Sequence, residues 1–195
     1  FRAEWSKDSK ALFVAANDCN TVSLWMLPIN GAVKKLNLSN ATITGAYWYN
    51  YTVGKNNAIA MIASTPQSPQ ELYFMANPES PPKQLTNFHQ EMKSVQLGKV
   101  ETFSWKSDEF TPNGILTFPP DFDPAKKYPL VVEPHGGPRS TSKESFNSST
   151  QLKAAHGYIV FQPNYRGSDN MGYRFSESIN GDAGEGPGRD VMKGL

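Results

Sequence analysis

Short apolar and aromatic runs alternate with polar, turn-forming clusters over the first 90 residues, which is typical of a series of β-strands. A polar segment from Trp5 to Lys10 precedes an apolar run from Ala11 to Ala16. The turn formers Asn17 to Asn20 separate that run from the next one, Thr21 to Leu27. The pattern therefore predicts a polar hairpin followed by two strands joined by a tight turn.

The same pattern of apolar and polar segments repeats after 48 to 49 residues. The offset is 48 residues for the first two matching segments and 49 for the third: Phe13-Val14-Ala15-Ala16 with Met61-Ile62-Ala63-Ser64, Leu24-Trp25-Met26 with Leu72-Tyr73-Phe74, and Lys34-Lys35-Leu36 with Lys83-Gln84-Leu85. A repeat of this length, built from short strands, favours four-stranded β-propeller blades over an ordinary meander or sandwich. Because two blades cannot close a ring, we expect further blades upstream.

The pattern changes after about residue 95, where strand signals alternate with helix signals. We predict the following elements in order: strands at Ile115 to Phe118 and Leu130 to Val132, a helix at Thr150 to His156 closed by Gly157, a strand at Tyr158 to Phe161, and a helix opened by Asp190. This alternation predicts a mainly parallel sheet with crossover helices, in which the apolar strand Leu130 to Val132 is buried. We therefore expect two domains, at residues 1–92 and 93–195.

Composition narrows the classes of function. Hydrophobic residues make up 38% of the 195-residue chain, which is enough for a real core, and 19 basic residues nearly balance 18 acidic ones. We expect neither nucleic acid nor a membrane as partner, because there is no strong charge of one sign and no apolar run long enough to span a bilayer. The single cysteine, Cys19, can form neither an intrachain disulfide nor a zinc site, so no metal is predicted.

The start of the chain and its glycosylation motifs bear on compartment. Phe1 is not a methionine and no signal-peptide pattern follows it, so we expect the true N-terminus to lie upstream. Four Asn-x-Ser/Thr motifs occur, at Asn37, Asn40, Asn50 and Asn147, where chance would give about two. The excess only faintly favours secretion, and the compartment, cytoplasmic or secreted, stays open.

A glycine-rich tetrapeptide, His135-Gly136-Gly137-Pro138, directly follows a predicted strand. In acyl-transfer enzymes such a loop lets backbone N–H groups approach a developing oxyanion, and glycine allows the close approach. A tight strand-to-helix turn is the alternative interpretation.

A second set of motifs makes the assignment more specific. Asn164-Tyr165-Arg166-Gly167-Ser168 follows the next strand, and Gly188-Arg189-Asp190 begins a predicted helix. Taken with His135-Gly136-Gly137-Pro138, this order and spacing resembles the prolyl oligopeptidase family of serine peptidases, in its acylaminoacyl-peptidase and dipeptidyl-peptidase branch. The resemblance implies β-propeller blades followed by a truncated α/β-hydrolase domain, with a Ser-Asp-His triad and a propeller that restricts access to short peptides.

The resemblance also implies roles for individual residues. Gly136 and Gly137 would contribute backbone N–H groups to the oxyanion hole. His135 stands where other branches have a tyrosine, and Arg166 would form a structural ion pair beneath the site. We interpret Asp190 as a helix N-terminal residue rather than a catalytic acid.

The chain contains no Gly-x-Ser-x-Gly motif, and its three histidines are His89, His135 and His156. The triad is therefore expected beyond Leu195, with the serine roughly 20 to 35 residues further on, so none of its members is predicted here.

The glycine-rich segment Gly184 to Gly188 lacks the preceding strand and the Gly-Lys-Ser/Thr sequence of a phosphate loop. We therefore do not expect it to bind a nucleotide.

We predict a parent serine-type peptidase that cleaves oligopeptides through an acyl-serine intermediate, needs no cofactor and is inactive as this fragment. An esterase or thioesterase of the same fold and a non-catalytic propeller scaffold are the alternatives. The sequence does not indicate the oligomeric state.

Overall fold

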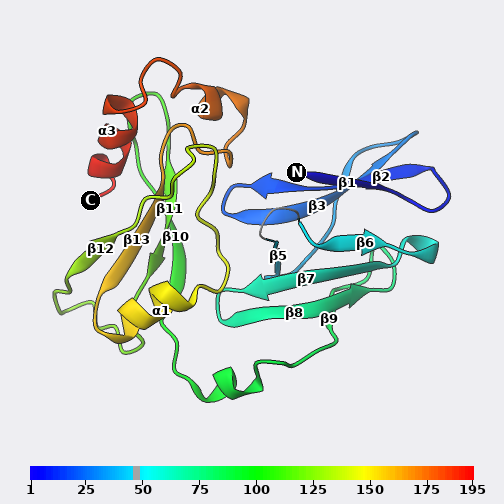
Figure 1. Ribbon diagram of the computed structural model, residues 1–195, viewed down its shortest axis with the longest axis horizontal. Coiled ribbons are helices and arrows are strands. Elements are labelled where there is room, and N and C mark those ends of the chain that lie inside the picture. The colour runs from blue at the N-terminus through cyan, green and yellow to red at the C-terminus, as the bar shows by residue number, and fades with distance from the viewer. Residues whose placement is uncertain (46–48) are drawn as a thin grey trace. The chain divides into compact units, whose positions relative to one another are not determined.

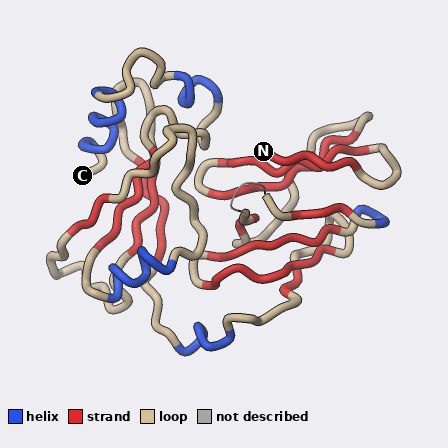
Figure 2. Tube along the Cα trace, in the orientation of Figure 1, coloured by secondary structure: helices blue, strands red, loops and turns tan. Residues whose placement is uncertain are grey.

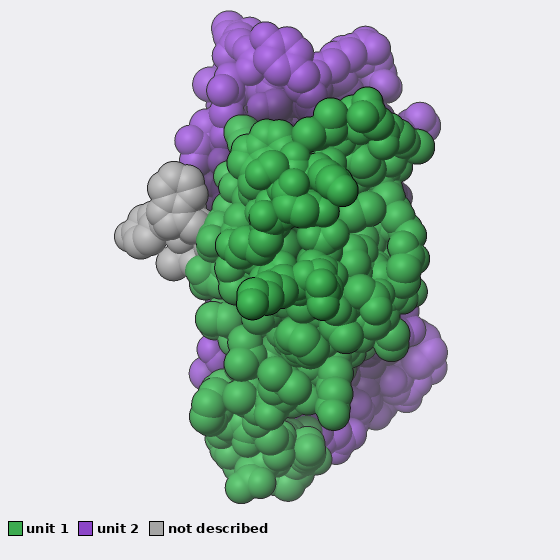
Figure 3. All heavy atoms as spheres, turned by 90° about the vertical axis from the view of Figure 1, so that its right-hand side faces the viewer, with its two compact units in different colours: residues 1–17, 21–95 green, residues 18–20, 96–195 purple. Residues whose placement is uncertain are grey.

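The computed structural model describes residues 1–45 and 49–195, so residues 46–48 of the predicted domain 1–92 lie outside the described residues. The chain divides into two compact units, which Figure 3 colours separately. Unit 1 comprises residues 1–17 and 21–95, and unit 2 comprises residues 18–20 and 96–195.

Unit 1 contains two antiparallel sheets. The first has the order β1-β2-β3-β4, with β1 at Arg2–Trp5, β2 at Ala11–Asp18, β3 at Thr21–Pro28 and β4 at Lys34–Lys35. The second has the order β5-β7-β8-β9, with β6 also paired to β7: β5 is Thr42–Ile43, β6 is Tyr51–Val53, β7 is Ile59–Thr65, β8 is Ser68–Met75 and β9 is Lys83–Gln84. The helical segments described in unit 1 are two short 3-10 turns, η1 at Lys55–Asn57 and η2 at Gln90–Ser94 (Figure 2).

The sequence repeat corresponds to the same three successive strands in each sheet. Its first segments lie in β2 and β7, its second in β3 and β8, and its third in or directly after β4 and β9. The predicted strands at 11–16 and 21–27 are confirmed as β2 and β3. The polar hairpin before β2 is held by the Ser6 hydroxyl, which accepts from the backbone N–H groups of Lys10 at 3.1 Å and Ala11 at 2.9 Å.

The core of unit 1 combines buried side chains from both sheets. Alternate residues of β2, Ala11, Phe13 and Ala15, are buried as a half-buried strand requires. The hydroxyl of the buried Tyr51 on β6 donates to the carbonyl of Phe13 at 2.8 Å. Burial, together with the charge of Glu4, raises the pKa of Tyr51 to about 12, so this donor keeps its proton at neutral pH.

A buried carboxylate ties the end of unit 1 to β8. Glu71 is 3% exposed, accepts from the Thr86 hydroxyl, and accepts from the backbone N–H of His89 at 3.1 Å. Burial alone would raise the pKa of Glu71, but the hydrogen bonds from Thr86, Phe88 and His89 outweigh it and lower the pKa to about 2. His89, for which we predicted no role, is therefore bound to β8 through Glu71; its ring Nδ1 lies 3.2 Å from Glu71 Oε1.

Unit 2 is built on a mixed sheet of order β10-β11-β13-β12 (Figure 1). Its strands are β10 (Val100–Ser104), β11 (Asn113–Thr117), β12 (Leu130–Val132) and β13 (Ile159–Asn164). Only β12 and β13 pair in parallel, so the expectation of a mainly parallel sheet is wrong for the described residues. The connection between β10 and β11 is too short for a parallel crossover, which explains the antiparallel start.

The predicted strand at Leu130 to Val132 is confirmed, but its predicted burial is wrong. Within the described residues β12 pairs with β13 on one edge, and Leu130 is 44% exposed. The described residues leave this strand partly exposed, so burial among them does not explain why its side chains are apolar.

Three α-helices complete the described part of unit 2: α1 at Ser148–Ala155, α2 at Tyr173–Glu177 and α3 at Glu185–Lys193. Helix α1 begins earlier than predicted because the Asn147 side chain caps it, accepting from the N–H groups of Ser149 and Thr150. Gly157, with φ +86°, ends it as expected. Among the described residues, every helix falls short of the length and hydropathy needed to cross a bilayer.

Helix α3 begins at Glu185, so the expectation that Asp190 opens it is wrong. The Asp182 carboxylate accepts from the Gly186 N–H at 3.0 Å and thereby satisfies a donor in the first turn. Pro187 also fits a first turn, where a missing N–H costs nothing. The glycine-rich segment Gly184 to Gly188 therefore forms the start of a helix.

Candidate active site

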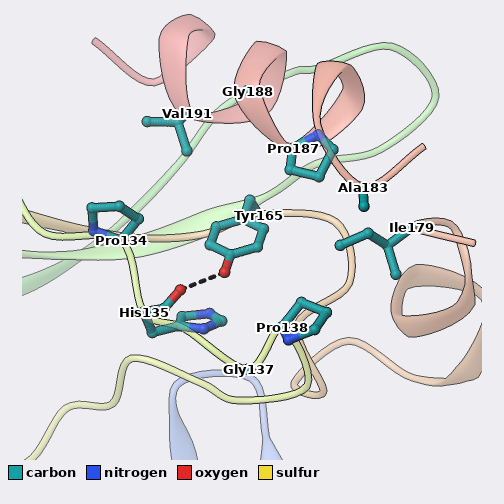
Figure 4. A pocket seen from close by; sticks show the side chains of 10 residues that line it. All are labelled: Pro134, His135, Gly137, Pro138, Tyr165, Ile179, Ala183, Pro187, Gly188 and Val191. Carbon is teal, nitrogen blue, oxygen red and sulfur yellow. Dashed lines mark hydrogen bonds between the residues drawn. The ribbon is translucent and has the colours of Figure 1, made fainter.

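The two loops that follow the parallel strands β12 and β13 leave the same edge of the sheet, where ligands bind in many α/β folds. They line a pocket of about 470 Å³ together with the segment that contains α3 (Figure 4). Its walls are mostly apolar: Pro134, Pro138, Ile179, Ala183, Pro187 and Val191 line it beside His135, Gly137, Tyr165 and Gly188.

The glycine pair follows β12, and Gly137 lines this pocket. Gly137 has φ +131°, a backbone conformation that residues with a Cβ rarely adopt. A Cβ there would lie 3.3 Å from the backbone N of Arg139. Gly136 has open space around it. Among the residues that the structure describes, neither glycine N–H donates a hydrogen bond to a backbone or side-chain acceptor. The loop thus offers two uncommitted donors beside an apolar pocket.

His135 connects this loop to the loop after β13. Its ring stacks on the ring of Tyr165, with centroids 4.7 Å apart and planes 19° apart. The Tyr165 hydroxyl donates to the backbone carbonyl of His135, as the dashed line in Figure 4 marks. The His135 Nε2 lies 2.9 Å from the hydroxyl of Ser168, and Nδ1 lies 3.1 Å from the carbonyl of Gly136. Burial lowers the pKa of His135, which favours the neutral ring at pH 7.

The distance between His135 and Ser168 invites comparison with a nucleophile and its base. Ser168, however, is fully buried, and its hydroxyl donates to the Tyr165 carbonyl at 2.6 Å. A hydroxyl that a substrate cannot reach and whose proton is already committed is a poor nucleophile. The His135 Nδ1 faces a carbonyl rather than an orienting carboxylate, so the pair lacks the third member of a triad.

Arg166 lies at the centre of a buried ion cluster. Its Nε donates to Asp190 Oδ2 at 2.9 Å, and one terminal nitrogen reaches Asp190 Oδ1 at 2.7 Å and Asp108 Oδ2 at 2.6 Å. Both Arg166 and Asp190 are almost completely buried. Hydrogen bonding to Asp190 raises the pKa of Arg166, so the guanidinium stays charged. Asp190 thus lies mid-helix as a partner of Arg166.

Asp108 is the member of this cluster that the sequence did not reveal. Lys193 Nζ donates to its Oδ1 at 2.9 Å, and this bond together with the one from Arg166 lowers the pKa of Asp108. Asp108 and Arg166 are 58 residues apart in the chain, and no local pattern marks the pair.

The described residues hold no group of three or more His, Cys, Asp or Glu side chains that could bind a metal ion.

The chain is similar to known proteins along its whole length. The model of the prolyl oligopeptidase family matches residues 144–195. The chain is 27% identical to an uncharacterized peptidase, YuxL, of Bacillus subtilis over 196 residues, covering 100% of the chain and 29% of the relative. It is 28% identical to dipeptidyl-peptidase 5 of Arthroderma benhamiae over 195 residues, covering 97% of the chain and 27% of the relative.

Solved structures show the same fold. An acylaminoacyl peptidase in complex with Z-Gly-Gly-Phe-chloromethyl ketone superposes with a TM-score of 0.84 at 22% identity, covering 100% of this chain and 29% of that one. Uncomplexed acylaminoacyl peptidase of Pyrococcus horikoshii gives a TM-score of 0.82 at 22% identity, covering 99% and 29%. The chain thus spans less than a third of the length of these relatives. The family model, the curated relatives and the solved structures thus agree in a similarity to the prolyl oligopeptidase family and its peptidases.

Proposed function

We propose that this chain is part of a serine peptidase and that Gly136 and Gly137 form the upstream half of its oxyanion hole. The observation that carries the proposal is the pair of uncommitted backbone N–H groups beside the pocket, on a loop that directly follows a parallel strand. In α/β-hydrolases the loop between the third strand and the next helix contributes such a donor, and here the loop joins β12 to α1. Two N–H dipoles aimed at one point stabilise the negative charge of a tetrahedral intermediate.

The same proposal gives each of the two predicted domains a different role. Residues 1–92 would be blades of a β-propeller, which the repeated order of strands in the two sheets of unit 1 supports. Residues 93–195 would be the first part of an α/β-hydrolase domain, which the mixed sheet and its crossover helix α1 support. A propeller would limit substrates to oligopeptides, a class consistent with the peptidase names of the curated relatives.

The chemistry would be acyl transfer to a serine. A base removes the serine proton, the oxygen attacks the scissile carbonyl, and the carbonyl oxygen acquires a negative charge that the two glycine N–H groups stabilise. The 195 residues contain no Gly-x-Ser-x-Gly motif, and Ser168 is buried. We therefore propose that turnover belongs to a longer protein and that the 195-residue chain alone is inactive. Arg166 would act structurally, holding the loop after β13 through its ion pairs.

The test is a substrate comparison with the full-length protein. We expect it to hydrolyse dipeptide and acylated amino-acid anilides, and to lose this activity after treatment with a serine-directed phosphonate. Hydrolysis of p-nitrophenyl esters without hydrolysis of any amide would favour the esterase alternative. Absence of both activities, with no phosphonate incorporation, would favour the scaffold.

A further inference from the structure

The oxyanion loop has few attachments of its own near the glycine pair. At its start, the Glu133 N–H donates to the carbonyl of Phe161 at 2.8 Å, and at its far side the Asp169 N–H donates to the carbonyl of Ser140 at 3.2 Å. Between them, Arg139 pairs with Glu177, but the Arg139 side chain is 60% exposed, and exposed pairs contribute little. Among the residues that the structure describes, the remaining attachment between these points is His135.

The loop after β13 is, by contrast, firmly placed. Gly167 has φ +100°, and a Cβ there would lie 2.7 Å from a side-chain carbon of Ile179. Its N–H donates to the carbonyl of the buried Phe175 at 2.9 Å. Ser168 is fully buried, and its hydroxyl is fixed by the Tyr165 carbonyl. This loop can therefore act as a template for a neighbouring loop that has few attachments of its own.

Three contacts define how the template holds His135. The Ser168 hydroxyl, which lies 2.6 Å from the Tyr165 carbonyl, lies 2.9 Å from the His135 Nε2 and so ties the ring to the loop after β13. The Tyr165 hydroxyl holds the backbone of His135, while the Tyr165 ring holds its side chain by stacking. One residue next to the glycine pair is thus fixed at its carbonyl, its ring face and its Nε2.

We propose that Tyr165 and Ser168 are positioning residues that, through His135, hold the Gly136-Gly137 backbone in the orientation needed to bind the oxyanion. The inference rests on the proposed function of the glycine pair. Neither residue touches the reacting atoms in this account: Ser168 is buried, and the Tyr165 hydroxyl is committed to His135. Their effect is on geometry, and a donor displaced by about 1 Å can cost up to a hundredfold in rate.

The experiment compares two variants with two matched controls in the full-length protein. S168A removes the hydroxyl that contacts the His135 Nε2, and Y165F removes the hydroxyl bond to the His135 carbonyl but keeps the stacked ring. S107A is the control for the first, since Ser107 is equally buried and its hydroxyl has no partner among the described residues. Y173F is the control for the second, since Tyr173 is 81% exposed.

Two readouts separate positioning from general destabilisation. We expect kcat for a peptide anilide to fall about tenfold to a hundredfold in both variants with KM little changed, and to stay within about twofold in the controls. Hydrogen exchange followed by mass spectrometry should become faster in the peptide covering residues 133–142, with unit 1 unchanged. If S168A does not fold, Y165F carries the test, because the stacked ring preserves the packing.

The outcomes distinguish this inference from the function on which it rests. If the wild type hydrolyses peptides but both variants keep wild-type kcat and loop exchange, the positioning roles are wrong while the peptidase stands. If the wild type hydrolyses no acyl substrate, the proposed function fails and the catalytic part of the inference falls with it. Faster exchange in the variants would then still show that Tyr165 and Ser168 hold the loop.

Discussion

The buried ion pair between Arg166 and Asp190 permits a quantitative test of what holds the loop after β13. Changing Asp190 to Asn removes the charge that accepts three hydrogen bonds from Arg166: from the backbone N–H at 2.8 Å, from Nε at 2.9 Å and from a terminal nitrogen at 2.7 Å. The Arg166 side chain is 7% exposed and the Asp190 side chain 0% exposed, so water cannot replace the lost partner.

The magnitude follows from leaving a buried cation with one partner fewer. Arg166 cannot escape by losing its proton, because its pKa is raised rather than lowered. Asp108 remains, but it is shared with Lys193. Removing one member of a buried pair costs about 3 to 5 kcal/mol. The amide of asparagine keeps some hydrogen bonding, so we expect D190N to cost about 3 kcal/mol, at the lower end of that range.

Hydrogen exchange measures this loss locally. A loss of about 3 kcal/mol corresponds to roughly a hundredfold faster exchange for the protected amides of α3. The control is E185Q on the same helix: Glu185 is 91% exposed and its contact with Arg189 is 3.8 Å long, so exchange should stay within about threefold. If D190N accelerates exchange by less than about fivefold, the ion pair does not hold this part of the unit.

Three further predictions concern other parts of the chain. G137V in the full-length protein should lower kcat about a hundredfold to a thousandfold with little change in KM, since valine disfavours φ +131° and crowds the oxyanion position; an unchanged rate would reduce the glycine pair to a turn. E71Q should weaken unit 1 by about 1 to 3 kcal/mol at pH 7, measured by urea unfolding. Because the pKa of Glu71 is lowered to about 2, its contribution is complete above the unfolded value of 4.5 and is lost as the pH falls towards 2, so E71Q should abolish that part of the acid sensitivity; equal sensitivity in both proteins would contradict this. N147A should destabilise α1 by about 1 kcal/mol, measured as faster amide exchange in the helix, whereas N147D should change it little; equal exchange in N147A and wild type would mean that the cap is not needed.

Periodicity and turn chemistry predict those elements whose structure depends on local patterns. The strands β2 and β3 follow from alternating apolar positions between turn formers, and the bounds of β12 match the apolar run at Leu130 to Val132. The end of α1 follows from Gly157, because glycine adopts its positive φ without strain.

Contacts between residues that are separated in the chain could not be predicted from local sequence patterns. The first turn of α3 is rich in glycine and contains Pro187, a composition that indicates a loop until the Asp182 carboxylate is seen to cap it. The role of Asp108 depends on an arginine 58 residues away. In the candidate site the glycine motif could be located from the sequence, but the contacts of Ser168 with His135 could not, since two separate loops must first be brought together by parallel strands.

We propose that the N–H groups of Gly136 and Gly137 stabilise the oxyanion formed when a serine outside these 195 residues attacks the substrate. Mass spectrometry of peptides from the full-length protein, after reaction with a serine-directed phosphonate, tests this most directly. We predict a single adduct on the serine of a Gly-x-Ser-x-Gly motif, with loss of peptide hydrolysis in proportion to labelling. An adduct on Ser168, or full peptide hydrolysis with no adduct on any serine, would contradict the account.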